Sequence, residues 1–188
     1  ADVASELAFL FEAARNWSAA SEHYLIAAQN AAGVFANRES IELAQRGLAV
    51  LRLLPDTSER TRQELKLQMT LGPSLMAARG FAGPEVEQAF VRAAELSLQL
   101  DDRLDLFGAS FSLAIVFLVR AEYADSTRMA QQCLDLAGEL RKPAMLMQSE
   151  WVMGLCESYL GHFEEAHNPF EQTRVLHDAE PASSSNAL

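Results

Sequence analysis

Apolar residues recur at three- and four-residue intervals through most of this chain, which is the spacing of one buried face on an α-helix. Short stretches containing Pro, Gly or paired Asp interrupt this spacing, and no strand-like segment lies between them. The pattern therefore predicts nine helices, with ends accurate to a few residues: about 3–14, 17–35, 39–54, 58–79, 84–99, 103–120, 123–140, 144–160 and 163–177.

Individual residues indicate where some of these helices begin. Pro84 suits a first helical position, because the amide hydrogen that proline lacks has no partner there. Asp56, followed by Glu59, predicts a capping pair at the start of the fourth helix. Pro169 falls inside the last helix, where it should remove a hydrogen bond and kink the helix.

Long helices joined by very short turns form antiparallel hairpins, which either close into a bundle or stack in an open array. Internal repetition favours the stack. With the chain shifted against itself by 40 residues, Phe111 falls on Trp151 and Ala114 on Gly154, and a shift of 42 places Gly72 on Ala114. Three residues of the second helices are spaced by 40 and 40: Phe90, Ala130 and Phe170.

The most regular unit runs from Trp151 to Phe170. It has a large-then-small pair, Met153-Gly154, and a turn that reads Gly161-His162-Phe163-Glu164-Glu165-Ala166, with Phe170 four residues on. This unit resembles the tetratricopeptide family. The resemblance implies an all-α fold, a tetratricopeptide-like α-solenoid of antiparallel helical hairpins, with a repeat of about 40 residues instead of the usual ~34. Because Gly154 lowers helix stability by about 1 kcal/mol relative to Ala, we expect the second helix to approach its backbone closely.

Three other stretches carry a closer resemblance to a known family. They are 53–60, Leu71-Gly72-Pro73-Ser74-Leu75-Met76, and Phe81-Ala82-Gly83-Pro84-Glu85-Val86-Glu87-Gln88-Ala89. They resemble the helical C-terminal part of bacterial signalling proteins in which an adenylate/guanylate cyclase domain precedes an ATPase module. Related repeats occur in large ATP-dependent transcriptional regulators. The resemblance implies a sensor or scaffold segment, since the residues of the cyclase and ATPase sites are absent from this sequence.

Composition narrows the function further. The formal net charge is -11 and no basic run occurs, so we expect no nucleic-acid contact by this segment. The apolar run from Phe107 to Val119 is shorter than the ~20 residues that a membrane span needs, and it predicts a buried helix. Cys133 and Cys156 lie in apolar helical stretches and are expected to be small buried residues of a protein in a reducing, cytoplasmic compartment.

No catalytic centre is predicted. The turn around Gly80 and Gly83 lacks the Lys of a phosphate-binding loop. His162 and His167 are five residues apart, not the four that place two ligands on one helix face, and His177 and His23 add no ligand set. We therefore expect no metal, no cofactor and no enzymatic activity in this fragment.

The remaining candidate is a partner-binding groove along the first helices of the hairpins, as the family pattern implies. Its positions are mainly apolar and aromatic, which favours an amphipathic helix over a terminal carboxylate. These residues could equally pack between hairpins, so groove and core both remain open. The ten positions are Lys66, Met69, Met76, Phe111, Ile115, Leu118, Gln148, Trp151, Ser158 and Tyr159.

We therefore predict a repeat domain over residues 1–178 and a frayed tail over 179–188. Because the sequence begins at Ala1 without Met, we expect a fragment of a longer protein, and because no signal peptide is visible we expect a cytoplasmic one. The resemblance implies a bacterial protein. Its partner would be a protein or peptide, another domain of the parent protein, or a second copy of the chain. The alternative is a small-ligand sensor with an apolar pocket inside the superhelix.

Overall fold

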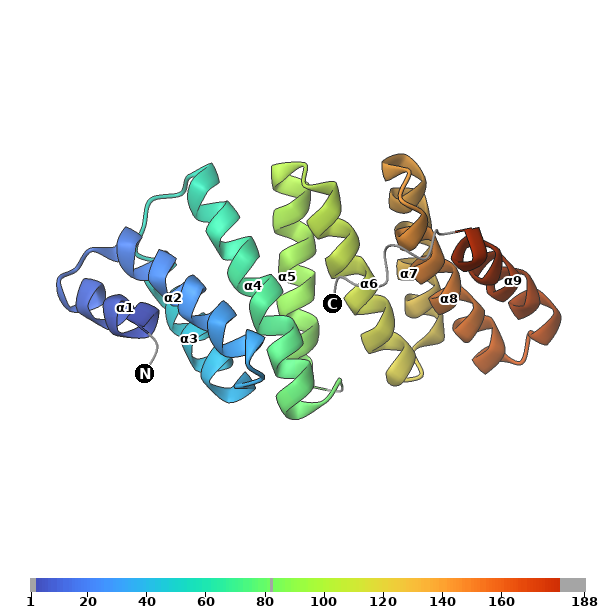
Figure 1. The fold of residues 1–188 in the computed structure, drawn as a ribbon, viewed down its shortest axis with the longest axis horizontal. Helices are drawn as coiled ribbons and strands as arrows, with labels where there is room; N and C mark the ends of the chain where they lie inside the picture. The colour runs from blue at the N-terminus through green and yellow to red at the C-terminus, as the bar shows by residue number, and fades with distance from the viewer. Residues whose placement is uncertain (1–2, 82, 180–188) are drawn as a thin grey trace. The chain divides into compact units, whose positions relative to one another are not determined.

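The computed structural model describes residues 3–81 and 83–179, and side chains as far as Val175. Within these ranges the protein holds nine α-helices and no strand, with consecutive helices joined by short turns (Figure 1). The tail predicted from residue 179 lies outside the described residues, apart from Ala179. The helices are α1 Val3–Ala13, α2 Trp17–Gly33, α3 Asn37–Leu51, α4 Ser58–Arg79, α5 Pro84–Leu100, α6 Arg103–Val119, α7 Tyr123–Leu140, α8 Pro143–Leu160 and α9 Phe163–Ala179.

The nine helices confirm the all-α prediction, and no end differs from its predicted position by more than three residues. The start of α4 needs one correction. Thr57, not Asp56, is the capping residue, because its backbone is extended and its Oγ1 accepts the amide hydrogen of Arg60 at 3.2 Å. The carboxylate of Asp56 instead lies 3.6 Å from the Arg60 guanidinium.

Proline residues occupy two different kinds of position. Pro84 begins α5, as the sequence predicts. Pro169 does not end α9, which continues to Ala179, and Pro73 likewise lies inside α4. Past Pro169, the Thr173 hydroxyl donates to the Pro169 carbonyl at 2.9 Å. The helix therefore continues through a residue that cannot donate a backbone hydrogen bond.

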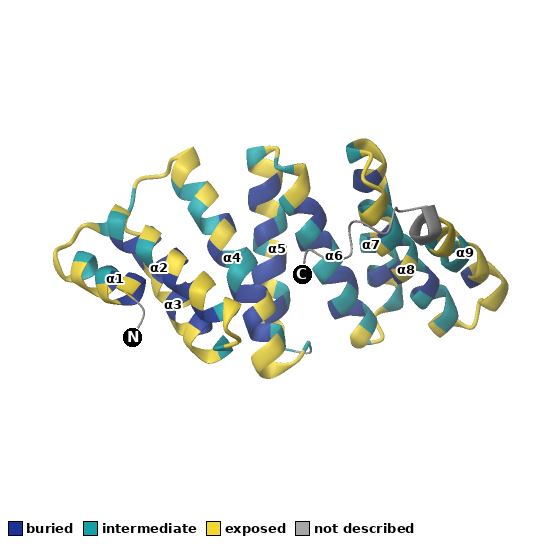
Figure 2. Ribbon diagram, viewed as in Figure 1, coloured by how far each residue is buried: buried dark blue, intermediate teal, exposed yellow. Residues whose placement is uncertain are grey.

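The chain divides into two compact units, residues 1–109 and 110–188. In the first, each helix from α1 to α5 packs on its neighbour in sequence, and α2 also contacts α4; in the second, α8 packs on both α7 and α9. Each unit has its own core, seen as the dark-blue stripes along the helices in Figure 2. The first core includes Leu65, Ala93, Leu96 and Ala109, and the second Ala114, Ala130, Val152 and Cys156.

A glycine on one helix and a phenylalanine on the next make the same contact in both units. A Cβ atom at Gly72 of α4 would lie 2.5 Å from the ring of Phe90 in α5. A Cβ atom at Gly154 of α8 would lie 2.7 Å from the ring of Phe170 in α9. The close approach predicted at Gly154 is confirmed, and at both positions a methyl group would force the phenylalanine ring to shift in a close-packed core.

The long apolar run is also a buried helix. It makes up most of α6, where Leu113, Ala114 and Val116 are almost fully buried. Among the described residues, every helix is either too short or too polar to cross a lipid bilayer.

Candidate functional site

The structure divides the ten residues of the predicted groove between the two units. None is buried: four are exposed and six are partly buried. The first unit holds three of them on α4, namely Lys66, Met69 and Met76. The second unit holds the other seven on α6 and α8, namely Phe111, Ile115, Leu118, Gln148, Trp151, Ser158 and Tyr159.

In the first unit, a groove runs between α2 and α4. A hollow of about 620 Å³ lies between the two helices, and Lys66 and Met69 are part of its lining. A second hollow of about 370 Å³ continues along the same helices, sharing Gln29, Met69 and Thr70 with the first. Together these hollows form the α2–α4 groove. Met76, the third predicted residue on α4, does not line either hollow.

The α2–α4 groove has an apolar floor and an acidic rim. Leu25 and Ile26 of α2 face Met69 of α4 across the first hollow, and Met69 also packs on the core. Three carboxylates and one ammonium group line the same hollow: Glu22, Glu59, Asp105 and Lys66. The lining therefore carries an excess of negative charge.

Asp105, one of these carboxylates, has a shifted pKa. Burial raises the pKa of its carboxyl group, the neighbouring negative charge of Asp102 raises it further, and Lys66 acts in the opposite direction. Gln63, which also lines this hollow, accepts at Oε1 from the Ser21 hydroxyl at 2.9 Å, and this bond ties α2 to α4.

A polar network on the other side of α2 fixes this helix against its neighbours. The Tyr24 hydroxyl donates to Oε2 of Glu12 in α1, and Nε of Arg46 in α3 donates to the same oxygen at 2.8 Å. Burial, and then the bond to Glu12, raise the pKa of Tyr24. The Arg46 guanidinium also lies 4.6 Å from the centre of the Phe9 ring. Three helices are therefore joined at one carboxylate.

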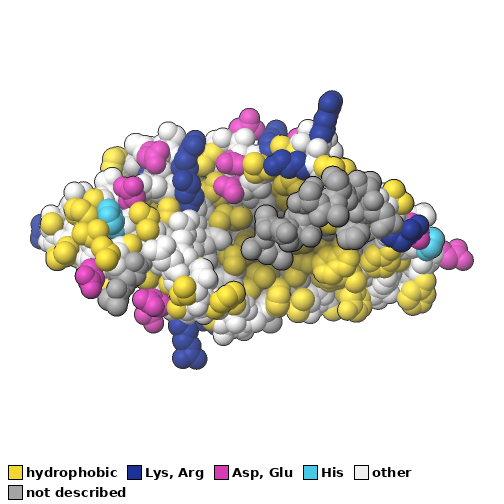
Figure 3. Space-filling model, in the orientation of Figure 1, with side chains coloured by type: hydrophobic (Ala, Val, Ile, Leu, Met, Phe, Trp, Pro, Cys, Tyr) yellow, Lys and Arg dark blue, Asp and Glu magenta, His cyan; other side chains and the backbone are white. Residues whose placement is uncertain are grey.

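The predicted residues of the second unit lie partly in its core. Phe111, Ile115 and Leu118 pack against the cluster around Ala114, and the side chain of Trp151 keeps 43% of its surface exposed. Hydrophobic side chains cover much of the visible face over α6 and α8 (Figure 3). Three of the predicted residues on α6 therefore pack on the core, whereas Trp151 on α8 remains accessible at the surface.

The histidines near the C-terminal end, for which the sequence predicts no metal site, do not form one in the described residues. Nδ1 of His162 lies 2.8 Å from Oε2 of Glu157, His167 is exposed, and the side chain of His177 lies outside the described residues. In the described ranges, no three His, Cys, Asp or Glu side chains converge as metal ligands would.

Both cysteines are buried and unbridged, which confirms their predicted role as small core residues. Burial raises the pKa of Cys133 to about 12, so its thiol stays protonated near neutral pH. The Cys156 thiol donates to Oγ of Ser126 at 3.1 Å.

Comparison with solved structures identifies a protein of similar fold. The structure matches that of BtubC (BKLC) from P. vanneervenii with a TM-score of 0.73 over 92% of this chain and 71% of that chain. The two sequences are 16% identical. The likeness at this identity extends to the all-α fold alone. No protein-family model matches this chain, and neither does any curated protein.

Proposed function

We propose that this chain is a non-catalytic interaction module whose α2–α4 groove binds a protein segment. The observation that carries the proposal is the position of Lys66 and Met69, which were predicted from the sequence to contact a partner and line one hollow with the α2 residues. An open groove with an apolar floor suits an amphipathic helix. The acidic rim favours a helix with basic residues beside its apolar face.

The helices themselves are proposed to be tetratricopeptide-like hairpins with a repeat of about 40 residues. The Gly72–Phe90 and Gly154–Phe170 contacts support this, because the same packing recurs in two units. In the hairpin between them, Ala114 and Ala130 belong to one core cluster. Whether the hairpins stack as an α-solenoid stays a prediction.

The resemblance to cyclase–ATPase proteins and transcriptional regulators supports a role in signalling. In this proposal, a partner bound to the α2–α4 groove biases an attached output domain through non-covalent contacts. Such a bias requires that the partner bind one state of the protein more tightly than the other.

The experiment is a titration of the chain with a labelled amphipathic helix of leucine and lysine, followed by fluorescence anisotropy. A helix of leucine and glutamate is the control for charge. We expect the basic helix to bind and Glu22→Gln combined with Glu59→Gln to weaken binding about tenfold. Glu42→Gln, an exposed substitution on α3, is the matched control. Equal binding of both helices, or no effect of the paired substitution, would reject the groove as the site.

The alternative, a sensor with an apolar pocket inside the superhelix, predicts an enclosed cavity. Both hollows of the α2–α4 groove are open to solvent and carry charged residues or amides, which favours the protein segment over a small apolar ligand at this place.

A further inference from the structure

A second cavity of the first unit gathers positive charge in a chain whose net charge is -11. It has a volume of about 210 Å³, and three arginines from three helices line it: Arg52 of α3's C-terminal end, Arg60 of α4 and Arg92 of α5. The only carboxylate among the described lining residues is Glu64. We call this cavity the arginine pocket.

The arginine pocket lies on the opposite side of α4 from the α2–α4 groove. Successive residues of a helix are turned by about 100°, so Lys66, Met69 and Thr70 share one side of α4. Glu64 and Gln68, which line the arginine pocket, lie roughly half a turn away from them. The two cavities are therefore separate sites on one helix.

The three guanidinium groups are not equally neutralised. Arg92 donates from Nε to Oε1 of Glu64 at 2.7 Å and from Nη1 to Oε2 of Glu95 at 3.1 Å. Arg60 lies 3.6 Å from the largely exposed carboxylate of Asp56, and its Nη1 donates to the carbonyl of Leu54 at 3.5 Å.

Arg52 differs from both. Within the described residues its guanidinium group has no hydrogen-bond or ion-pair partner, and only its backbone amide is bonded, to the carbonyl of Val50. Three guanidinium groups and one carboxylate therefore line the pocket, and the guanidinium group of Arg52 has all its donors available.

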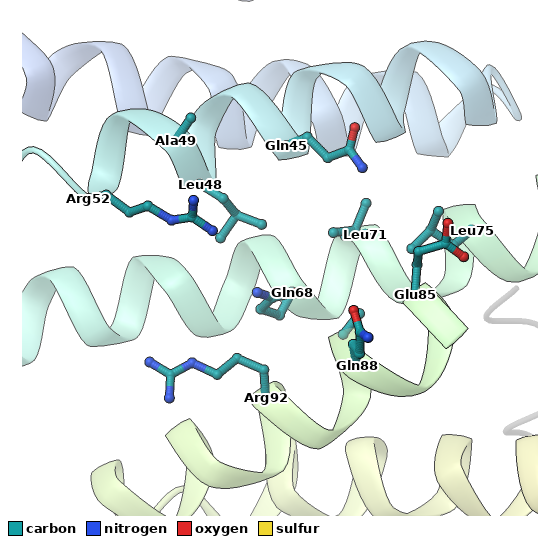
Figure 4. A pocket seen from close by; sticks show the side chains of 11 residues that line it. Gln45, Leu48, Ala49, Arg52, Gln68, Leu71, Leu75, Glu85, Gln88 and Arg92 are labelled. Carbon is teal, nitrogen blue, oxygen red and sulfur yellow. The ribbon is translucent and has the colours of Figure 1, made fainter. Parts of the chain in front are cut away.

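A larger cleft of about 410 Å³ continues from the arginine pocket and shares Arg52, Gln68 and Arg92 with it. Figure 4 shows Arg52 and Arg92 extending from α3 and α5 on either side of Gln68. Further along, Leu71 and Leu75 lie in the cleft lining with Gln45, Gln88 and Glu85. Oε1 of Glu85 lies 3.3 Å from Nη1 of Arg79. The cleft thus has arginines at one end and, at the other, leucines beside two amides and a carboxylate that already has a cationic partner.

We propose that this site binds an organic anion, with its carboxylate or phosphate group between Arg52 and Arg92 and a short apolar tail over Leu71 and Leu75. Guanidinium groups recognise both anions through paired, charge-assisted hydrogen bonds. The amide of Gln68 supplies a further donor between the two arginines. A ligand of this kind uses the charge at one end of the cleft and the leucines at the other.

Calorimetric titration of the whole chain with three matched probes tests the proposal. Hexanoate and hexyl phosphate carry the same tail with different head groups, and hexanamide has the tail without the charge. We expect one or both anions to bind in the millimolar range or tighter and hexanamide to bind at least about tenfold more weakly. The stronger of the two anions identifies the head group.

Variants then locate the site. Arg52→Gln is expected to weaken anion binding about tenfold or more, and Arg52→Lys to recover only part of it, because lysine keeps the charge without the planar fork. Arg62→Gln, an exposed position on α4 that does not line either cavity, is expected to change nothing. Circular dichroism confirms that each variant is folded.

Three results would overturn the proposal: no binding of either anion, hexanamide binding as tightly as the anions, or Arg62→Gln weakening binding as much as Arg52→Gln. Failure of the leucine–lysine helix to bind the α2–α4 groove would not affect this result, since the two sites have opposite charge and lie on opposite sides of α4.

Discussion

The ring of Phe90 in α5 lies so close to the backbone of Gly72 in α4 that a side chain at position 72 would overlap it. A Cβ atom at Gly72 would come within 2.5 Å of Cζ and 2.7 Å of Cε1 of this ring, which is completely buried. The ring cannot move away without disturbing the surrounding core, because protein interiors are close-packed. The two helices can therefore approach this closely only because residue 72 has no side chain.

The first prediction concerns this contact. Gly72→Ala should lower the free energy of unfolding by about 1–3 kcal/mol, because overpacking outweighs the better helix propensity of alanine. Gly138→Ala is the matched control: Gly138 lies in α7 with nothing within 4 Å of the added Cβ atom, so the change should stabilise by about 0.5–1 kcal/mol. Urea denaturation of the whole chain measures both. Equal effects of the two substitutions would show that Phe90 yields to the methyl group.

The second prediction concerns the carboxylate of Glu12. The hydrogen bond from Tyr24 lowers the pKa of Glu12 below its usual value of 4.5, burial acts in the opposite direction, and the hydrogen bond from Arg46 lowers the pKa further. A lowered pKa stabilises the folded state above that value, and this contribution is lost as the pH falls through the folded-state pKa. Glu12→Gln should therefore lower stability at pH 7 by about 1–2 kcal/mol, and the difference from the wild type should shrink below about pH 4.

Denaturant midpoints measured at several pH values test this prediction, with the exposed substitution Glu42→Gln on α3 as the control. A constant difference between wild type and Glu12→Gln across the acidic range would mean that the charge of Glu12 contributes nothing to stability.

The third prediction concerns self-association through the second unit. Trp151 is 43% exposed and Tyr159 is 62% exposed on α8, where the Tyr159 ring stacks on that of Tyr123 at a centroid distance of 5.6 Å. Exposed aromatic surface of this kind favours a protein contact. We expect the wild type to exceed the mass of a monomer in light scattering. Trp151→Ala should be a folded monomer that loses less than the 3–5 kcal/mol typical of a fully buried Trp.

Gln131→Ala, an exposed substitution on α7 outside the predicted groove, should leave the mass unchanged. If wild type and Trp151→Ala are both monomers, self-association through α8 is excluded. If the variant also loses several kcal/mol, Trp151 belongs to the core.

Helix positions could be predicted from the sequence because apolar spacing and the Pro and Gly interruptions are local signals. Thr57 was missed as a cap because Asp56 and Glu59 form a similar pattern one residue away. The close approach at Gly154 was predictable because a glycine inside a helix lowers stability unless packing requires it.

The candidate sites were only partly predictable. Lys66 and Met69 were found from the repeat pattern, but Glu22, Leu25 and Ile26 on the opposite wall were not, because residues 1–54 follow the repeat loosely. The arginine pocket was missed entirely. Its three arginines come from three helices, and tertiary packing alone places them around one cavity.

Pro73 directly follows Gly72 in α4 and lines the α2–α4 groove with Met69. A proline has no amide hydrogen, so the carbonyl of Met69, four residues earlier, loses the donor that an uninterrupted helix would supply. In the proposed interaction, this turn would offer a main-chain acceptor beside the groove's side chains. A partner that brings a donor group to the carbonyl of Met69 would complete the helix's own hydrogen-bond ladder on binding.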